Sequence, residues 1–469
     1  MTTSTEASAG AADTEPDPTP SERGGRWGRV RPFARRHWPF LLAALLGIAL
    51  RAAAMLGYRP VMWFPDSIDY LSGAVHLMPS LIRPSGYSLF LAPLPGLAWV
   101  AFLQHAMGVG MAVMLYALLV RRGVRPWPAG AATVPVLLDA FQVQLEQMVM
   151  SDTLFAFLVM AAVTVFLWPR ELTRRHVVAG AVLVGLAAIT RTAGLPLLAP
   201  LVVFLLARRV PWRTIVAGVA TVVLMLAGYG TWFAVEQGQF GMNRSTGIFL
   251  YGRVAPFADC HRMRVPVEEM PLCLASDPER RSVRKSYIWG MQAPRHRVDA
   301  EGFSKESEAL MRSFAVRAIV SQPLDYLAIA GTDIARTFRW GHPTFPDRDT
   351  YEYYLFRDDA KEALPDGDRL IRKYDPGFTE TRAVRPYSSF LGTYQRFAYL
   401  PGTVLGAFVL LGAARIVRER RAWGGDALLP WAAGVTLLLV PVFTAQFDYR
   451  YVLPAVPLIM LAALAKRPG

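Results

Sequence analysis

The stretch "WPFLLAALLGIALRAAAMLGY", residues 38–58, carries a single charge, Arg51, in 21 residues. A helix of this length, rising about 1.5 Å per residue, crosses the ~30 Å hydrocarbon layer of a membrane. No small-residue cleavage site follows, so we expect an uncleaved first span rather than a signal peptide. The polar stretch "FPDSIDYLSGA", residues 64–74, comes next and places the carboxylates of Asp66 and Asp69 beside the membrane.

The composition of the whole chain agrees with a membrane protein. Its 469 residues are 53% hydrophobic and 12% aromatic, and the mean hydropathy is +0.28, which is too apolar for an ordinary soluble protein. We therefore predict an all-α polytopic membrane protein with about ten spans. After the first, they are expected near 96–120, 127–145, 152–168, 176–189, 193–207, 213–235, 398–418, 428–446 and 450–466.

The distribution of positive charge predicts the orientation of these spans. Short loops on one side hold fifteen Lys and Arg residues, with six more in the N-terminal tail, whereas the other side holds four: Arg59, Arg83, Arg191 and Arg450. Positive charge favours the cytoplasm, so we expect both termini there, and an Arg-rich composition typical of GC-rich bacteria suggests a bacterial plasma membrane. No basic stripe of the nucleic-acid type is present.

Four regions follow from this topology. Residues 1–37 form a disordered and basic cytoplasmic tail, 38–235 an N-terminal transmembrane module, 236–397 a mainly helical exterior segment, and 398–469 the last three spans. An interfacial helix is expected in the first exterior loop, after Asp66. A helix is also expected over 304–340, followed by a charged loop, "RDDAKEALPDGDRLIRKYDPG".

The only two cysteines, Cys260 and Cys273, both fall in the exterior segment. Oxidation is permitted outside the cytoplasm, so we expect a disulfide; two unpaired thiols are the alternative. The seven histidines are scattered over both sides of the membrane, a pattern that does not suggest zinc.

Several sites of cytoplasmic chemistry are absent from the sequence. It contains no G-x-x-x-x-G-K-[ST], no G-x-G-x-x-G after a strand and no H-E-x-x-H. No predicted cytoplasmic loop is longer than about ten residues, so none could enclose a nucleotide. Any chemistry must therefore use groups near the outer face, and charges at a membrane boundary are functional hypotheses by default. These charges are Arg51, Asp66, Asp69, Asp139, Glu146, Asp152, Arg191, Asp448 and Arg450.

Six motifs in order resemble the integral-membrane GT-C glycosyltransferases, and more narrowly the protein mannosyltransferase-like and aminoarabinose-transferase-like enzymes. They are "FPDSIDYL" with "RPSGYSLFLAPL", "MVMSDTLFAFLVM", "GLAAITRTAGLPLL", "AVRAIVSQPLDYL" and "RYVLPAVPLI". The likeness covers roughly 38–235 and 310–466, while 240–300 matches no motif and leaves the acceptor open.

The resemblance implies transfer of a sugar from a polyprenyl-phosphate donor to an extracytoplasmic glycan, lipid or protein acceptor. Asp66 and Tyr70 match the start of the family's first exterior loop, and Ser151 and Asp152 match its S-E or S-D pair. Such a reaction needs a base for the acceptor hydroxyl and positive charge on the leaving phosphate.

We assign catalysis to Asp66 and Asp152. Arg191, Arg450 and Arg51 are assigned to binding the donor phosphate, because the forked donors of arginine match phosphate oxygens. Tyr70 and Tyr451 are assigned as supporting residues of the site. A Mg²⁺ or Mn²⁺ ion between the two carboxylates is a further hypothesis.

Structural alternatives accompany these assignments. Asp66 is also a good helix N-cap, and the only role of Asp69 could be to stabilise the helix through a favourable interaction of its negative charge with the helix dipole. Arg191 and Arg450 could be interfacial anchors, and Asp152 could cap the fourth span. At the level of function, the alternatives are a lipid-linked glycan ligase or polymerase and, more distantly, a secondary transporter or a membrane scaffold.

Overall fold

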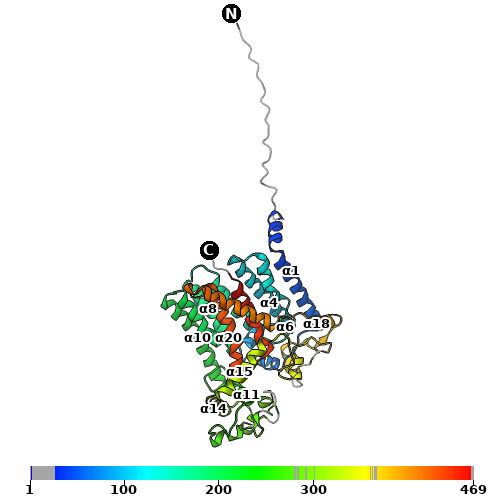
Figure 1. Cartoon of the computed structure of the whole chain (residues 1–469). Coiled ribbons are helices and arrows are strands. Elements are labelled where there is room, and N and C mark those ends of the chain that lie inside the picture. The colour runs from blue at the N-terminus through cyan, green and yellow to red at the C-terminus, as the bar shows by residue number, and fades with distance from the viewer. Residues whose placement is uncertain are drawn as a thin grey trace.

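The computed structural model describes residues 2, 27–278, 281, 285–290, 293–299, 302–359, 361, 363 and 367–465. The described chain is almost entirely helical. Figure 1 shows a bundle that contains α4, α8, α10 and α20, with α11 and α14 at the end opposite the start of α1. Most of the tail predicted over 1–37 lies outside the described residues.

The N-terminal half forms most of the bundle. Its elements are α1 (Trp27–Gly57), β1 (Tyr58–Arg59), α2 (Ser67–His76), α3 (Gly86–Leu91), α4 (Leu97–Arg121), α5 (Pro126–Leu137), α6 (Ala140–Gln147), α7 (Ser151–Leu167), α8 (Arg174–Thr190), η2 (Thr192–Leu197), α9 (Leu198–Ala207) and α10 (Trp212–Gln237).

The remaining elements form residues 236–397, which the sequence predicts to lie outside the cytoplasm, and the last helices. They are α11 (Thr246–Val254), η3 (Val267–Leu272), α12 (Lys285–Ile288), α13 (Arg295–Val298), α14 (Lys305–Ser321), α15 (Pro323–Thr337), α16 (Arg348–Glu352), α17 (Asp368–Tyr374), β2 (Arg382–Ala383), α18 (Tyr387–Gln395), α19 (Gly402–Arg418), η6 (Arg420–Ala422), η7 (Gly425–Ala427), α20 (Leu428–Thr444), α21 (Tyr449–Val452), η8 (Leu453–Ala455) and α22 (Val456–Leu464).

Four described helices are long and apolar enough to cross a membrane: Ala34–Gly57, Leu97–Arg121, Trp212–Gln237 and Gly425–Thr444. Shorter apolar helices lie at Ser151–Leu167, Thr192–Ala207 and Tyr449–Leu464. These helices make the protein a polytopic membrane protein, and each predicted span coincides with at least one helix.

Two predicted boundaries are wrong. The first helix begins at Trp27, so the basic stretch before residue 38 joins α1 instead of the tail. The predicted span 127–145 is broken at Asp139, whose carboxylate accepts hydrogen bonds from the backbone N–H of Phe141 and Gln142 and caps a new helix, α6. All eight residues of α6 are buried.

Part of the predicted exterior segment, residues 248–318, has a core of its own, whereas Tyr354, Ile371 and Phe378 belong to the main bundle core. Helices α11 and α14 pack closely in the core of 248–318, and Cys260 and Cys273 are joined in the predicted disulfide. The helix expected over 304–340 is present but broken at Gln322, because Pro323 occupies the first position of α15 and lacks the N–H that would continue α14. The charged stretch predicted as a loop also contains a helix, α17.

A two-stranded antiparallel sheet ties the end of α1 to the segment before α18. Tyr58 pairs with Ala383 and Arg59 with Arg382. A parallel bridge then joins Met62 to Met148, just before α7. These pairings fix the path of residues 58–66, which leads directly to Asp66.

Candidate functional site

The carboxylate of Asp66 lies between two arginines. Asp66 precedes α2 at the N-cap position, but its side chain makes no capping hydrogen bond. Its Oδ1 instead lies 2.6 Å from Nη2 of Arg83, and its Oδ2 lies 3.1 Å from Nη1 of Arg450. The capping interpretation is therefore not supported, and the side chain is free of any local backbone role.

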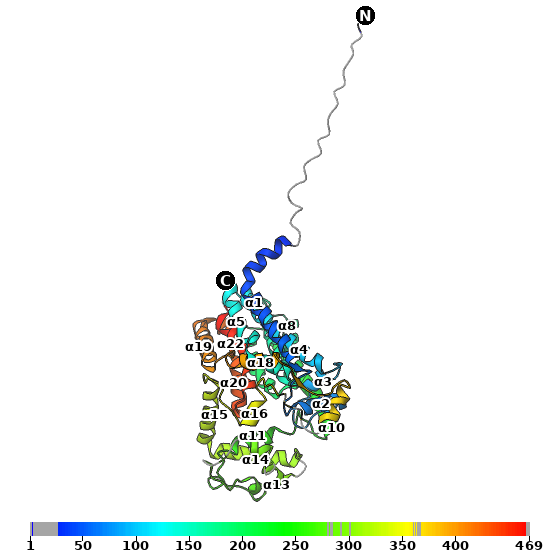
Figure 2. The ribbon, with the colours of Figure 1, turned by 90° about the vertical axis from the view of Figure 1, so that its right-hand side faces the viewer.

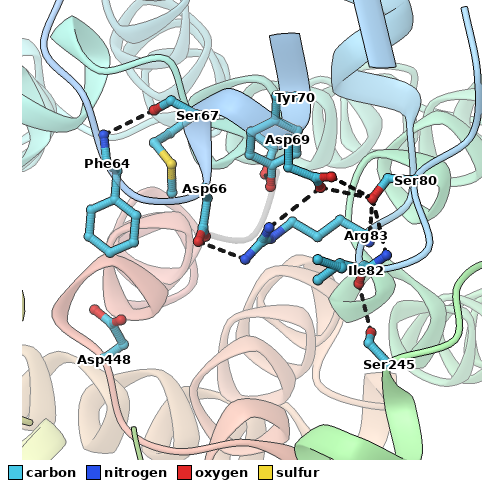
Figure 3. A network of polar contacts seen from close by, with 12 residues as sticks. Phe64, Asp66, Ser67, Asp69, Tyr70, Ser80, Ile82, Arg83, Ser245 and Asp448 are labelled. Atoms are coloured by element: carbon cyan, nitrogen blue, oxygen red, sulfur yellow. Dashed lines mark hydrogen bonds and ion pairs between the residues drawn. The ribbon is translucent and has the colours of Figure 1, made fainter. Parts of the chain in front are cut away.

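Arg83 is held in place from α2 and from its own loop (Figure 3). Ser80 Oγ donates to both oxygens of Asp69, at 2.9 and 2.8 Å, and the Asp69 Oδ2 lies 3.5 Å from Nη1 of Arg83. The Arg83 guanidinium also lies 5.7 Å from the ring centre of Tyr70. Asp69 thus orients Arg83, which agrees with a structural role for Asp69.

Arg450 projects from the short helix α21 toward Asp66. Asp448 caps α21 by accepting from the Arg450 N–H, and its Oδ2 lies 3.4 Å from Arg450 Nε. The hydroxyl of Tyr354 donates to the same Oδ2 at 2.9 Å. The guanidinium of Arg450 lies 4.6 Å from the ring centre of Phe64, so this arginine is enclosed by aromatic rings and carboxylates rather than anchored in headgroups.

Arg191 and Asp152 form an ion pair beside this group. Asp152 opens α7 and is 1% exposed at its side chain, and Arg191 ends α8 and contacts its Oδ2. Ser151 Oγ accepts from Arg191 Nη1 at 3.3 Å and lies 2.8 Å from the Tyr70 hydroxyl. The pair "SD" therefore reaches both the arginine and α2.

The ring of Tyr451 links the two halves of the site. The Arg191 guanidinium lies 5.2 Å from its centre and the Arg450 guanidinium 5.1 Å. We call the three arginines Arg83, Arg191 and Arg450, with Asp66, Asp152 and Asp448, the Arg–Asp cluster. It joins α2, the consecutive helices α7 and α8, and α21, which lie in three distant parts of the sequence.

Burial and charge act in opposite directions on the two carboxylates of α2. Burial raises the pKa of Asp66, but the positive charges of Arg83 and Arg450 outweigh it, so the pKa lies below 3.8. For Asp69, burial prevails over Arg83 and Ser80, and the pKa is raised above 3.8. Asp66 is therefore ionised at neutral pH, with each of its oxygens beside an arginine.

Arg51 does not reach the Arg–Asp cluster, which corrects its predicted role in phosphate binding. Its Nε lies 2.8 Å from Glu146 Oε2, and Nη1 donates to the Leu137 carbonyl at 2.8 Å. His105 Nδ1 lies 2.9 Å from the same Glu146 oxygen. Because Arg51 is 3% and Glu146 0% exposed, this is a closed structural network between α1, α4 and α6.

Arg83 was not singled out from the sequence, although it stands at the head of the quoted motif "RPSGYSLFLAPL". Tyr354 and Asp448 were likewise not assigned to the site. The available signal was that motif and the position of Asp448 two residues before Arg450. Nothing in the sequence indicates that Tyr354 meets Asp448, because they are 94 residues apart.

The predicted metal pair does not fit the side chains. Asp66 faces two guanidinium groups and Asp152 faces a third, so three of the four carboxylate oxygens are beside arginines, whose positive charge opposes a bound cation. Among the described residues, no group of three or more His, Cys, Asp or Glu side chains could hold a metal ion.

Comparisons with known proteins reveal only distant likeness. No family model matches the sequence, and no curated protein matches it significantly. The apo structure of the Archaeoglobus fulgidus oligosaccharyltransferase covers 95% of this chain at 13% identity and a TM-score of 0.38. This chain spans about half, 51%, of that protein's length.

A second solved structure is ArnT from Cupriavidus metallidurans bound to undecaprenyl phosphate. The structural alignment covers 91% of this chain and 77% of the ArnT chain, at 12% sequence identity and a TM-score of 0.37. Both proteins are GT-C membrane glycosyltransferases, the family whose motifs this sequence resembles. TM-scores below 0.5 do not establish a shared fold, so function is argued from the motifs and the Arg–Asp cluster.

Proposed function

We propose that the protein is a glycosyltransferase of the GT-C type that moves a sugar from a polyprenyl-phosphate donor to an extracytoplasmic acceptor. The observation that carries the proposal is the Arg–Asp cluster. It places two guanidinium groups beside the Asp66 carboxylate and a third beside the Asp152 carboxylate, on residues of the motifs that resemble this family.

The donor phosphate would lie against Arg191 and Arg450. Their guanidinium groups share the Tyr451 ring at 5.2 and 5.1 Å, and arginine donors match phosphate oxygens in a forked geometry. Two positive charges stabilise the negative charge that grows on the leaving lipid phosphate. The phosphate would replace Asp152 as the partner of Arg191, so Asp152 holds that arginine in position before the donor binds.

Asp66 would serve as the base. As the bond between the anomeric carbon and the phosphate oxygen breaks, the acceptor oxygen bonds to that carbon and passes its proton to the Asp66 carboxylate. Positioned general bases contribute about 10²- to 10⁴-fold in rate. Arg83 and Arg450 hold both Asp66 oxygens, and Tyr70 links this region to Ser151 through its hydroxyl.

The proposed setting is a bacterial plasma membrane with ten spans and both termini in the cytoplasm. The Arg–Asp cluster and the exterior segment then lie on the outer side, where lipid-linked sugars are available without nucleotide. The sugar is a hexose or pentose.

A purified protein supplied with radioactive sugar on a polyprenyl phosphate tests the proposal. We expect label in an added membrane-derived acceptor fraction, and loss of that transfer in Arg191→Gln. A ligase or polymerase of lipid-linked glycans would instead require a donor that carries a preassembled glycan. Uptake of sugar into proteoliposomes without any transfer to acceptor would contradict both enzyme hypotheses.

A further inference from the structure

The turn that connects α20 to α21 carries part of the Arg–Asp cluster. Residues 445–448 belong to no helix or strand, and they end at Asp448, which caps α21 and lies beside Arg450. Phe447 and Asp448 are buried, and a buried backbone N–H outside a helix needs a partner from elsewhere in the chain. The groups that bind this turn therefore determine where Asp448 and Arg450 point.

Helix α15 holds this part of the chain from one of its faces. The hydroxyl of Tyr326 donates to the Phe443 carbonyl at 2.7 Å, in the last turn of α20. The N–H of Phe447 donates to Oδ2 of Asp333 at 3.3 Å. Tyr326 and Asp333 are separated by about two helical turns, so their side chains leave the same face of α15. This face thus contacts the chain both before and within the turn.

Asp333 also contacts the core of residues 248–318. Arg253 of α11 belongs to that part of the chain, and its Nη1 donates to the same Oδ2 of Asp333 at 2.7 Å. Both side chains are 0% exposed. Because replacing a buried ion pair by apolar residues often costs no stability, a role of this pair in fixing geometry is favoured.

The carboxylate of Asp333 is held on both of its oxygens. Its Oδ2 accepts from Arg253 and from the Phe447 N–H, while its Oδ1 lies 2.5 Å from Nη1 of Arg336, one turn further along α15. Figure 2 shows α15 between the exterior helices α11 and α14 and the bundle helices α19 and α20. One oxygen atom therefore connects the exterior core of 248–318 to the turn before α21.

We propose that Asp333 is a positioning residue for Arg450. Its carboxylate fixes the turn, so that the Arg450 guanidinium lies beside Asp66 and the ring of Tyr451, where it meets the donor phosphate in the proposed reaction. Through Arg253, the same carboxylate makes the position of Arg450 depend on the exterior core. The kinetic consequence rests on the proposed sugar transfer, whereas the hydrogen bond to Phe447 does not.

Two double variants that differ in one acceptor atom test this role. Arg253→Met/Asp333→Asn and Arg253→Met/Asp333→Leu both remove the ion pair, but only Asn keeps an oxygen for the Phe447 N–H. We expect the Leu variant to have a KM for the polyprenyl-phosphate sugar about tenfold above that of the Asn variant, the size of one lost hydrogen bond to a buried N–H. Loss of folded protein alone would lower the rate and leave KM unchanged.

Amide hydrogen exchange gives a second measurement that needs no sugar transfer. In a peptide that covers 443–452, exchange should be faster in the Leu variant than in the Asn variant, because the Phe447 N–H has lost its acceptor. If the wild type transfers no sugar, the proposed function fails, and the comparison of exchange still decides whether Asp333 holds the turn. Equal exchange in the two variants, or equal donor KM, would overturn the role of Asp333.

A matched control removes another ion pair between the same two parts of the chain. Arg262 lies 2.7 Å from Asp325 at the start of α15, with side chains 58% and 38% exposed. Arg262→Met/Asp325→Leu does not touch the turn and should leave both donor KM and exchange unchanged. An equal change in this control would assign the effect to any loosening of α15 and overturn the proposal. Arg253→Met/Asp333→Ala also lacks the acceptor and repeats the comparison if the Leu variant does not fold.

Discussion

Replacing Asp66 by Asn removes the charge that faces two buried arginines and changes little else in shape. Arg83 lies 2.6 Å and Arg450 3.1 Å from this carboxylate, whose side chain is 11% exposed. Removing one partner of a buried ion pair costs about 3–5 kcal/mol. Each arginine keeps a second carboxylate, Asp69 at 3.5 Å and Asp448 at 3.4 Å, so we expect the low end, about 3 kcal/mol.

The effect on turnover should be larger than this loss of stability explains. If Asp66 takes the acceptor proton, Asp66→Asn should lower transfer by about 10²- to 10⁴-fold per folded molecule. The assay is sugar transfer from the lipid donor, normalised to folded protein measured by size-exclusion chromatography in detergent. A matched control is Asp69→Asn, on the same helix and beside the same Arg83.

The two variants should separate clearly. Asp69→Asn should keep at least about a tenth of the wild-type rate, because only the orientation of Arg83 is disturbed and this falls short of the loss expected for a general base. If Asp66→Asn retains as much, or if both variants lose the same fraction, Asp66 is not the base, and Asp152 becomes the residue to test.

Three further outcomes are expected. Thiol alkylation should leave Cys260 and Cys273 unlabelled until reductant is added, and labelling without reductant would rule out the disulfide. Replacing both cysteines by Ser should lower the free energy of unfolding by about 3 kcal/mol, the value for a loop of this size. A cysteine placed at Ser276 should react with an impermeant maleimide on intact cells and one at Arg420 should not, while the reverse pattern would invert the proposed topology. Burial lowers the pKa of His342 to about 4, so between pH 6.5 and 4 the unfolded chain protonates His342 and the native chain does not. As the pH is lowered through this range, the Tm of the wild type should therefore fall more steeply than that of His342→Phe. Parallel curves of Tm against pH would show that this histidine is protonated while folded.

Local patterns in the sequence predict much of the helical content. The apolar runs coincide with helices, and the pair Cys260 and Cys273 follows from its position outside the predicted cytoplasmic side. The break at Asp139 was missed because a continuous apolar run conceals a capping carboxylate. The early start of α1 was missed because the basic residues before residue 38 were assigned to the tail, although Arg is a good helix former.

The candidate site could be predicted only in part. Asp66, Asp152, Arg191 and Arg450 are brought together as their shared motifs suggested, but no periodicity tells which arginine meets which carboxylate. In a membrane, helix faces are apolar all round, so the facing side of a helix is not marked as it is in a soluble bundle. Arg51 was misassigned for this reason, since its partner is set by helix packing.

The enclosed network of Arg51 bears on how the chain enters the membrane. An arginine within an apolar helix opposes insertion by about 2.5–3.5 kcal/mol at the helix centre, and Glu146, its counter-charge, is made 95 residues later. The first helix therefore enters the bilayer with its charge unmatched and gains its final stability only after α4, α5 and α6 have been synthesised. Final assembly of α1 is thus coupled to the synthesis of α6, and a nascent chain that stops before Glu146 should hold α1 only loosely in the bilayer.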